Sequence, residues 1–257
     1  IDNYGESGNN YEALFFTNPK KLAAPTTKGL KIIPDYIKKA NKPNKYMILL
    51  KEDIDSLSED NSSEPIAHYK FEGNFNNSSG DNYNGTFSSS GPTYTKGYKD
   101  GIKAIQLNGA EHINLGSDIG TIFNDNSFTI SSFIYDENDN SANYSGFFLH
   151  DGNSEVNKKL HLNIYPSSVL QDIQKKIRFG FWGNNLESET RLENNKWFQL
   201  TFTYDKITKT RKIYINGKLD NTDVSDGNYN GGTNNVYIGK ASNNQYFTGK
   251  ISDFRIY

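Results

Sequence analysis

The chain has 257 residues, a formal net charge of −2, no cysteine and 14% aromatic residues. This aromatic content indicates a packed core and excludes a wholly disordered chain. The absence of cysteine excludes a disulfide framework and a cysteine nucleophile. The lack of a basic excess argues against nucleic acid as the main partner. The sequence contains no apolar run long enough for a membrane span.

Residues 1–63 differ from the rest of the chain. The stretch 18–65 holds five of the seven prolines among alternating lysine-rich and acidic patches. We predict an irregular arm or linker over 1–63, with a short helix near Asp35–Ala40 and a strand at Tyr46–Leu50. A second independent domain is the weaker alternative, because roughly 60 residues bury little core. Residues 64–257 then form one domain.

From Pro65 onward, short apolar stretches recur between turn signals. No helical period separates them, which favours an all-β fold made of two antiparallel sheets, a sandwich or jelly roll, over a βαβ fold. The expected strands are 66–71, 103–107, 112–115, 127–135, 146–150, 160–165, 176–182, 197–204, 211–215, 235–239 and 248–257.

The stretch "WFQLTFTYDKITKTRKIYINGKL" (197–219) predicts three consecutive antiparallel strands. Its first strand alternates, with Phe198, Leu200, Phe202 and Tyr204 on one face. The pair Asn216-Gly217 tolerates the positive φ angles of a type I′ turn, so we expect a tight hairpin there.

These motifs resemble the laminin G-like, concanavalin A-like lectin/glucanase family. Trp197 followed by Tyr214-Ile215-Asn216-Gly217 is similar to that family's tryptophan strand and Tyr-x-Asn-Gly turn. Three further stretches agree in order, and the resemblance covers 66–257: "IAHYKFEGNFNNSSGDNYNGT", "SFTISSFIY" and "VYIGKASNNQYFTGKISDFRIY". The "IYING" turn is also similar to the lectin-like half of clostridial neurotoxin receptor-binding regions, a neighbouring branch of the fold.

The resemblance implies a two-sheet concanavalin A-like sandwich that recognises ligands without catalysis. We expect a carbohydrate-recognition module that binds host or polymer glycans. It would be part of a larger secreted or surface-exposed protein of a bacterium or virus. The alternative is a structural or docking module that contacts other domains within a toxin, adhesin or viral tail assembly. Fold does not decide between them.

The family resemblance also implies a possible calcium site between the opening loop and the closing strand, since hard cations take oxygen ligands. The candidate ligands are Glu72, Asn77 and Asp253. Asn77 and Ser252 stand where the family has acidic residues, so two charges are lost. The alternative is that the Asn/Gly-rich loop satisfies its own backbone through Asx turns.

A glycan site is predicted from the faces of three strands. Apolar residues alternate in 160–165, 176–182 and 197–204, and the residues between them project away from the core. If these strands adjoin, one face carries an aromatic ring and planar polar groups, which suit sugars. The set is His161, Asn163, Arg178, Trp182 and Gln199. The alternative is that Trp182 lies under a loop and Arg178 forms an ordinary surface pair.

Two other possibilities are open. The loops that contain Tyr83, Tyr94, Tyr98 and Tyr229 mix aromatic and small polar residues, as recognition loops do. A glycoside hydrolase would need a pair of carboxyl groups in the binding face, and the expected strands carry almost no acids there. We therefore predict that the domain is not an enzyme.

Overall fold

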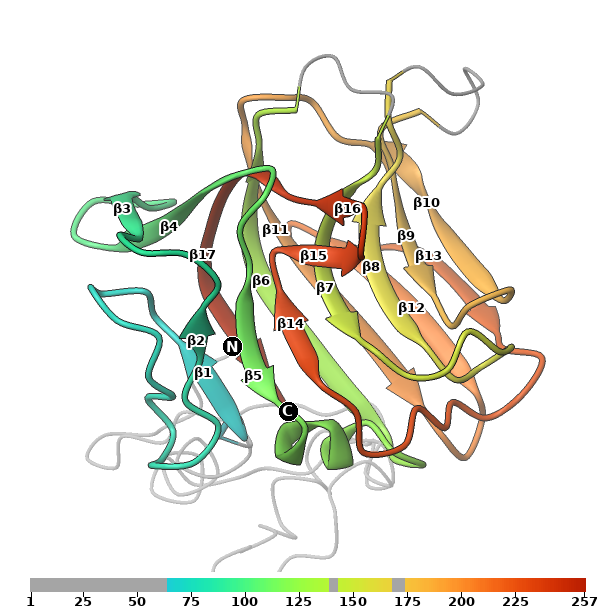
Figure 1. Ribbon diagram of the computed structural model, residues 1–257. Coiled ribbons are helices and arrows are strands. Elements are labelled where there is room, and N and C mark those ends of the chain that lie inside the picture. Colours follow the sequence, from blue (N-terminus) through green and yellow to red (C-terminus); the bar gives the residue numbers. More distant parts are fainter. Residues whose placement is uncertain (1–63, 139–142, 168–173) are drawn as a thin grey trace, which may run out of the picture. The chain divides into compact units, whose positions relative to one another are not determined.

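The computed structural model of the chain describes residues 64–138, 143–167 and 174–257 (Figure 1). The chain divides into two units, Ile1–Ser63 and Glu64–Tyr257, and the second is the domain described below. The predicted arm over 1–63, with its helix near Asp35–Ala40 and strand at Tyr46–Leu50, lies outside the described residues.

Two antiparallel sheets form the domain. The first follows the order β13–β12–β11–β6–β17–β4–β3, with β1 also paired to β17. Its strands are β13 (Lys218–Val224), β12 (Thr210–Ile215), β11 (Trp197–Asp205), β6 (Phe128–Asp136), β17 (Thr248–Ile256), β4 (Lys103–Asn108), β3 (Thr93–Lys96) and β1 (Ala67–Tyr69).

The second sheet has seven strands in the order β10–β9–β8–β7–β14–β5–β2. They are β10 (Asn185–Arg191), β9 (Lys176–Gly180), β8 (Leu160–Ile164), β7 (Ser145–His150), β14 (Val236–Ile238), β5 (Ile113–Gly116) and β2 (Thr86–Phe87). A short 3-10 helix spans Asp118–Ile122. The predicted all-β, two-sheet antiparallel fold is confirmed.

The core lies between the two sheets and is rich in aromatic rings. Phe202 of β11 contacts Phe179 of β9 and Phe147 of β7, with ring centroids 5.5 and 5.9 Å apart. Phe254 of β17 stacks on Phe148 of β7 at 5.7 Å. Each contact joins one sheet to the other, so the alternating apolar residues of the sequence are what hold the sandwich together.

A two-stranded hairpin, β15 (Lys240–Ser242) with β16 (Gln245–Tyr246), lies in front of β7 and β8 (Figure 1). Every residue of β7 and β8 is buried, which the core alone does not explain, because a half-exposed strand alternates. The hairpin backbone at Ala241 and Gln245 comes so close to Gly146 that a Cβ there would clash. Gly146 therefore lets the hairpin cover the outer face of β7.

The predicted three-strand unit at 197–219 is confirmed. β11 pairs with β12 and β12 pairs with β13, both antiparallel. Asn216 and Gly217 have φ angles of 51° and 75°, the positive values that the Asn-Gly pair predicted.

Candidate functional site

A pocket of about 290 Å³ opens on the outer face of the seven-stranded sheet, beside the β15–β16 hairpin. It brings together three of the five side chains predicted for a glycan site. Its lining residues are His161, Arg178, Trp182, Gly183, Asn185, Ala241, Ser242 and Gln245. We call it the Trp182 pocket.

Trp182 lies in the turn between β9 and β10 and not on a strand, which corrects the expectation that 176–182 is one continuous strand. The amide of Phe181 donates to the carbonyl of Asn184 at 2.8 Å, and Trp182 and Gly183 between them have φ angles of 54° and 72°. This is the geometry of a two-residue type I′ turn, and a bulky residue with positive φ is unusual there. The side chain is 39% exposed.

A buried arginine from the opposite sheet binds this turn from the side of the core. Arg211 of β12 is fully buried and donates to the carbonyl of Asn184 at 2.9 Å and to its side-chain Oδ1 at 2.8 Å. Its Nε and Nη2 bind the carboxylate of Asp223 at 3.0 and 2.5 Å. The side-chain amide of Asn184 donates in turn to Asn157 and Ser225. The turn that carries Trp182 is thus anchored to both sheets.

Arg178 of β9 lies against two neighbouring tyrosine rings, whose centroids are 5.2 Å apart. Its guanidinium carbon lies 4.3 Å from the ring centroid of Tyr165 and 4.8 Å from that of Tyr144. Nε donates to the Tyr165 hydroxyl at 2.9 Å, and Nη2 binds both tyrosine hydroxyls. The nearest carboxylate oxygen, on Glu187, is 4.0 Å from Nε. Stacking and hydrogen bonds together fix the orientation of the guanidinium.

His161 and Asn163 are buried, where the alternation of β8 predicted exposed side chains. The edge of the His161 ring faces Trp182 at 6.3 Å between ring centroids, and a Cβ on Gly180 would clash with the His161 ring. Burial, followed by the positive charge of Arg178, lowers the pKa of His161 to about 3, so the imidazole is neutral at pH 7.

Two polar atoms beside this pocket are buried without a protein partner. They are Nδ1 of His161 and Oδ1 of Asn163, whereas the Asn163 amide donates to Gln245 at 3.0 Å. Other buried side-chain atoms among the described residues also lack a partner, so these two do not by themselves mark a functional region.

Gln199 does not belong to this group. The expectation that its strand adjoins 160–165 and 176–182 is wrong, because β11 lies in the eight-stranded sheet between β6 and β12. The Gln199 amide donates to Ser131 at 2.9 Å and to Thr201 at 2.7 Å, on the other side of the sandwich.

The hairpin residues Ser242 and Gln245, with Asn185 at the start of β10, are pocket residues that the sequence reasoning missed. The only sequence signal was the pair Asn243-Asn244 between two short polar stretches, a turn signal within the final motif. Nothing in a strand pattern says that this hairpin folds over β7.

The three predicted calcium ligands are already engaged by protein groups. Asn77 accepts the amides of His68 and Ser79 at 2.8 and 3.0 Å, as the Asx-turn alternative predicted. Asp253 accepts from His68 at 2.6 Å and from Arg255 at 3.1 Å.

Glu72 and Asp253 line a pocket of about 240 Å³, but three cationic side chains, Lys70, Lys99 and Arg255, line it too. Glu72 itself accepts the backbone amide of Lys103 at 3.0 Å. Within the described part of the chain, no three His, Asp or Glu side chains come together as metal ligands. These residues do not fit a divalent cation, because its ligands must be available and the surrounding charge negative.

The loop tyrosines do not form a common recognition surface. Tyr229 is fully buried and bonds to His150, and Tyr98 stacks flat on Phe133 at 3.5 Å. The hydroxyl of Tyr69 donates to the carbonyl of Tyr83, whose side chain packs against the core.

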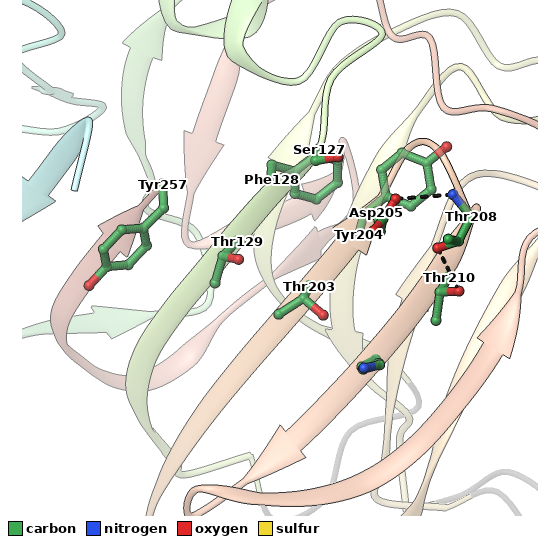
Figure 2. Close-up of a pocket in the computed structure, with 10 residues that line it drawn as sticks. Ser127, Phe128, Thr129, Thr203, Tyr204, Asp205, Thr208, Thr210 and Tyr257 are labelled. Carbon is green, nitrogen blue, oxygen red and sulfur yellow. Dashed lines mark hydrogen bonds between the residues drawn. The ribbon is translucent and has the colours of Figure 1, made fainter. Parts of the chain in front are cut away.

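A larger groove of about 650 Å³ lies at the end of β6, β11 and β12 in the other sheet (Figure 2). Its lining is dominated by hydroxyl groups, which include Thr129, Thr203, Thr208 and Thr210. Two of its aromatic residues, Phe128 and Tyr204, are only 3% and 2% exposed. The third aromatic residue of its lining, Tyr257, is half-buried, so the groove has no exposed tryptophan like that of the Trp182 pocket.

An antiparallel two-sheet sandwich with a pocket on an outer sheet face is the architecture of the lectin-like β-sandwich class. A family model described as the concanavalin A-like lectin/glucanases superfamily matches residues 107–257, so the chain belongs to that family. This confirms the resemblance drawn from the sequence motifs. No curated protein sequence matches the chain.

Solved structures with the same fold come from an enzyme-attached domain and from toxins. Domain 4 of AbnA, a GH43 extracellular arabinanase from Geobacillus stearothermophilus solved in complex with arabinotriose, has a TM-score of 0.57 at 21% identity. The match covers 76% of this chain and 92% of that one.

The botulinum neurotoxin serotype G binding domain has a TM-score of 0.54 at 18% identity, covering 76% of this chain and 47% of that one. The binding domain of paraclostridial mosquitocidal protein 1 has a TM-score of 0.51 at 16% identity, covering 71% and 45%. The chain thus spans about half the length of these toxin domains. At such identities the likenesses show the fold.

Proposed function

We propose that the domain is a non-catalytic carbohydrate-recognition module whose ligand binds in the Trp182 pocket. One observation carries the proposal: a tryptophan ring that is 39% exposed borders a pocket lined by an arginine, two amides and a hydroxyl. Such a ring covers the apolar C–H face of a sugar, and planar polar groups bond its paired hydroxyls.

The backbone of the turn supports the same conclusion. Residues held in sparsely populated backbone regions cost free energy and cluster at binding sites. Trp182 is one of ten described non-glycine residues with a positive φ angle, and at its place in a type I′ turn asparagine or glycine is the commoner choice. The exposed ring gives a reason for tryptophan at this position.

The residues that line the pocket supply no pair of carboxyl groups for glycoside hydrolysis, which supports a binding role. Among the residues that the structure describes, no helix is long and apolar enough for a membrane crossing. We place the domain outside the cell, as part of a larger secreted or surface protein of a bacterium or virus. The extracellular arabinanase and the toxin binding domains of the same fold support this setting.

The experiment is a broad glycan array probed with the wild-type chain, Trp182→Ala and Trp197→Ala. Trp197 is the matched control, because it is the second of two tryptophans and lies on the other sheet against Tyr135. We expect binding that Trp182→Ala removes and Trp197→Ala keeps, with both variants folded by circular dichroism. An array without any binding would reject the proposal.

A second candidate function, docking of other domains of the parent protein, is favoured by one apolar region. Ile207, Leu219 and Val224 are 91%, 53% and 66% exposed, at the β11–β12 turn and on edge strand β13. Leu219 and Val224 lie near opposite ends of β13, and exposed apolar surface of this kind is typical of protein contacts. No binding to any glycan on the array, together with partner binding that Ile207→Ser removes, would favour the docking role.

A further inference from the structure

We propose that the Trp182 pocket prefers acidic glycans, that is, sugars with a carboxylate such as uronic acids. The inference rests on the proposed function and names the ligand class of the same site. It follows from the charge of the pocket wall, from the free edge of one guanidinium and from the weak pairing of that guanidinium with nearby carboxylates.

The pocket wall carries one charged side chain, and it is a cation. Of the eight lining residues only Arg178 is charged at pH 7, because His161 is neutral and the others are amides, a hydroxyl, the indole or small apolar groups. A guanidinium donates hydrogen bonds and accepts none, so it selects acceptor oxygens. A carboxylate is the sugar substituent that offers only acceptors together with the opposite charge.

Part of the Arg178 guanidinium is unused. Nε and Nη2 are bound to the hydroxyls of Tyr165 and Tyr144, while Nη1 has no hydrogen bond to any described residue. The side chain is 16% exposed, so its charge is poorly hydrated. Nη1 is therefore a preorganised donor, since the tyrosine rings already fix the geometry and little side-chain entropy is left to lose.

The carboxylates near Arg178 do not neutralise it closely. Glu187 is 4.0 Å from Nε and accepts the Tyr165 hydroxyl at 2.9 Å, so it lies on the tyrosine side of the guanidinium. The Arg178–Glu187 contact is therefore a long ion pair and lacks the close bidentate geometry of the strong arginine–carboxylate pairs.

A second cation stands beside the tryptophan ring. Lys159 Nζ is 5.5 Å from the ring centroid of Trp182 and pairs with Asp151 at 2.7 Å. A sugar beside the indole would thus meet Arg178 within the pocket and the Lys159–Asp151 ion pair next to the ring, where the lysine offers a donor but its charge is already paired. Charge-assisted hydrogen bonds are about twice as strong as neutral ones, which gives the carboxylate its advantage.

The test uses two ligands with the same sugar backbone, trigalacturonate and its fully methyl-esterified form, in which each carboxylate is replaced by a neutral methyl ester. Calorimetry at low and moderate salt compares the wild-type chain with Arg178→Gln, Arg178→Lys and the control Arg191→Gln, an exposed arginine on β10. We expect the acid to bind about tenfold or more tightly than the ester, with an advantage that shrinks as salt rises.

Arg178→Gln should remove that preference while the ester keeps its affinity within about threefold, and Arg178→Lys should retain part of it because the charge remains. Equal binding of acid and ester by the wild-type chain would overturn the acidic preference and leave the proposed function in place. A chain that binds neither, and no sugar on the array, would overturn both.

Discussion

At the residue scale, the proposed binding role and the backbone conformation favour different residues at position 182. Its φ angle of 54° places a large L-residue in the left-handed region, next to Gly183 in a type I′ turn. The conformation costs free energy that the buried core beneath the turn offsets. A residue chosen for stability alone would be asparagine here.

Replacing Trp182 with asparagine should therefore stabilise the domain and abolish binding. We expect the free energy of unfolding to rise by about 1 kcal/mol, because asparagine tolerates the left-handed region. Urea unfolding measures the stability and the glycan array measures the binding. A variant that is less stable than wild type would show that the indole contributes packing in place of function.

Buried histidines should make stability depend on pH. Burial lowers the pKa of His161 to about 3 and that of His150 to about 4. Below pH 6.5 these histidines become protonated in the unfolded chain but stay neutral in the folded one. Their contribution to the free energy of unfolding is therefore fully present above pH 6.5 and is lost as the pH falls toward 4. The slope is at most about 1.4 kcal/mol per pH unit for each histidine.

Urea unfolding at several pH values between 7 and 5 measures this slope, with His161→Gln as the variant. The variant should lose one histidine's share of the pH dependence while the rest remains with His150 and with His112, whose pKa burial also lowers. An unchanged slope in His161→Gln would contradict burial of the neutral imidazole.

At the scale of elements, the β9–β10 turn depends on a residue of the opposite sheet. Arg211 binds Asn184 and Asp223 from a fully buried position. Removing one partner of a buried ion pair leaves an uncompensated charge. The turn geometry, and with it the orientation of Trp182, should therefore change when Arg211 loses its contact with Asp223.

We expect Asp223→Asn to lower the free energy of unfolding by about 3 kcal/mol and to change the emission of Trp182 in a Trp197→Phe background. The matched control is Glu193→Gln, which breaks an exposed pair with Lys196 and should cost less than about 0.5 kcal/mol. Similar effects of the two substitutions would show that the buried clamp is dispensable.

The elements also show what the sequence could predict. Alternation located β6, β11 and β12 because one face of each packs on the core, and the Asn-Gly pair located the turn between β12 and β13. β10 escaped notice because this edge strand, "NLESETR", is largely polar. The exposure of β8 was predicted incorrectly because the β15–β16 hairpin covers it, and such a contact between distant segments leaves no local pattern.

The residues of the candidate site likewise divide into those with a local sequence pattern and those placed by contacts between distant segments. The strand pattern placed His161 and Arg178 on one face, because β8 and β9 are neighbours in the sheet as well as in the chain, and Trp182 reaches the same pocket from the turn that follows β9. Gln199 was assigned to the same face only because its strand comes next in sequence, and the chain crosses to the other sheet between β10 and β11. No local pattern in the sequence shows that the chain passes from one sheet to the other between β10 and β11.

At the scale of the whole molecule, calcium should have no effect on the fold. Asp253 pairs with His68 and Arg255, and Lys70 and Lys99 border the same pocket. The cationic surroundings oppose a divalent cation. We expect the midpoint of thermal unfolding to be equal, within about 1 °C, in millimolar calcium and in chelator. A rise of several degrees with calcium that Asp253→Asn removes would contradict this expectation.

The central claim, that a glycan binds against Trp182, is tested most directly by tryptophan fluorescence. In the Trp197→Phe variant Trp182 is the sole tryptophan, and the variant can be titrated with the strongest glycan from the array. The account predicts a saturable change in emission and protection from acrylamide quenching, with the affinity that calorimetry gives. Binding by calorimetry with unchanged emission and unchanged quenching would place the ligand elsewhere and contradict the claim.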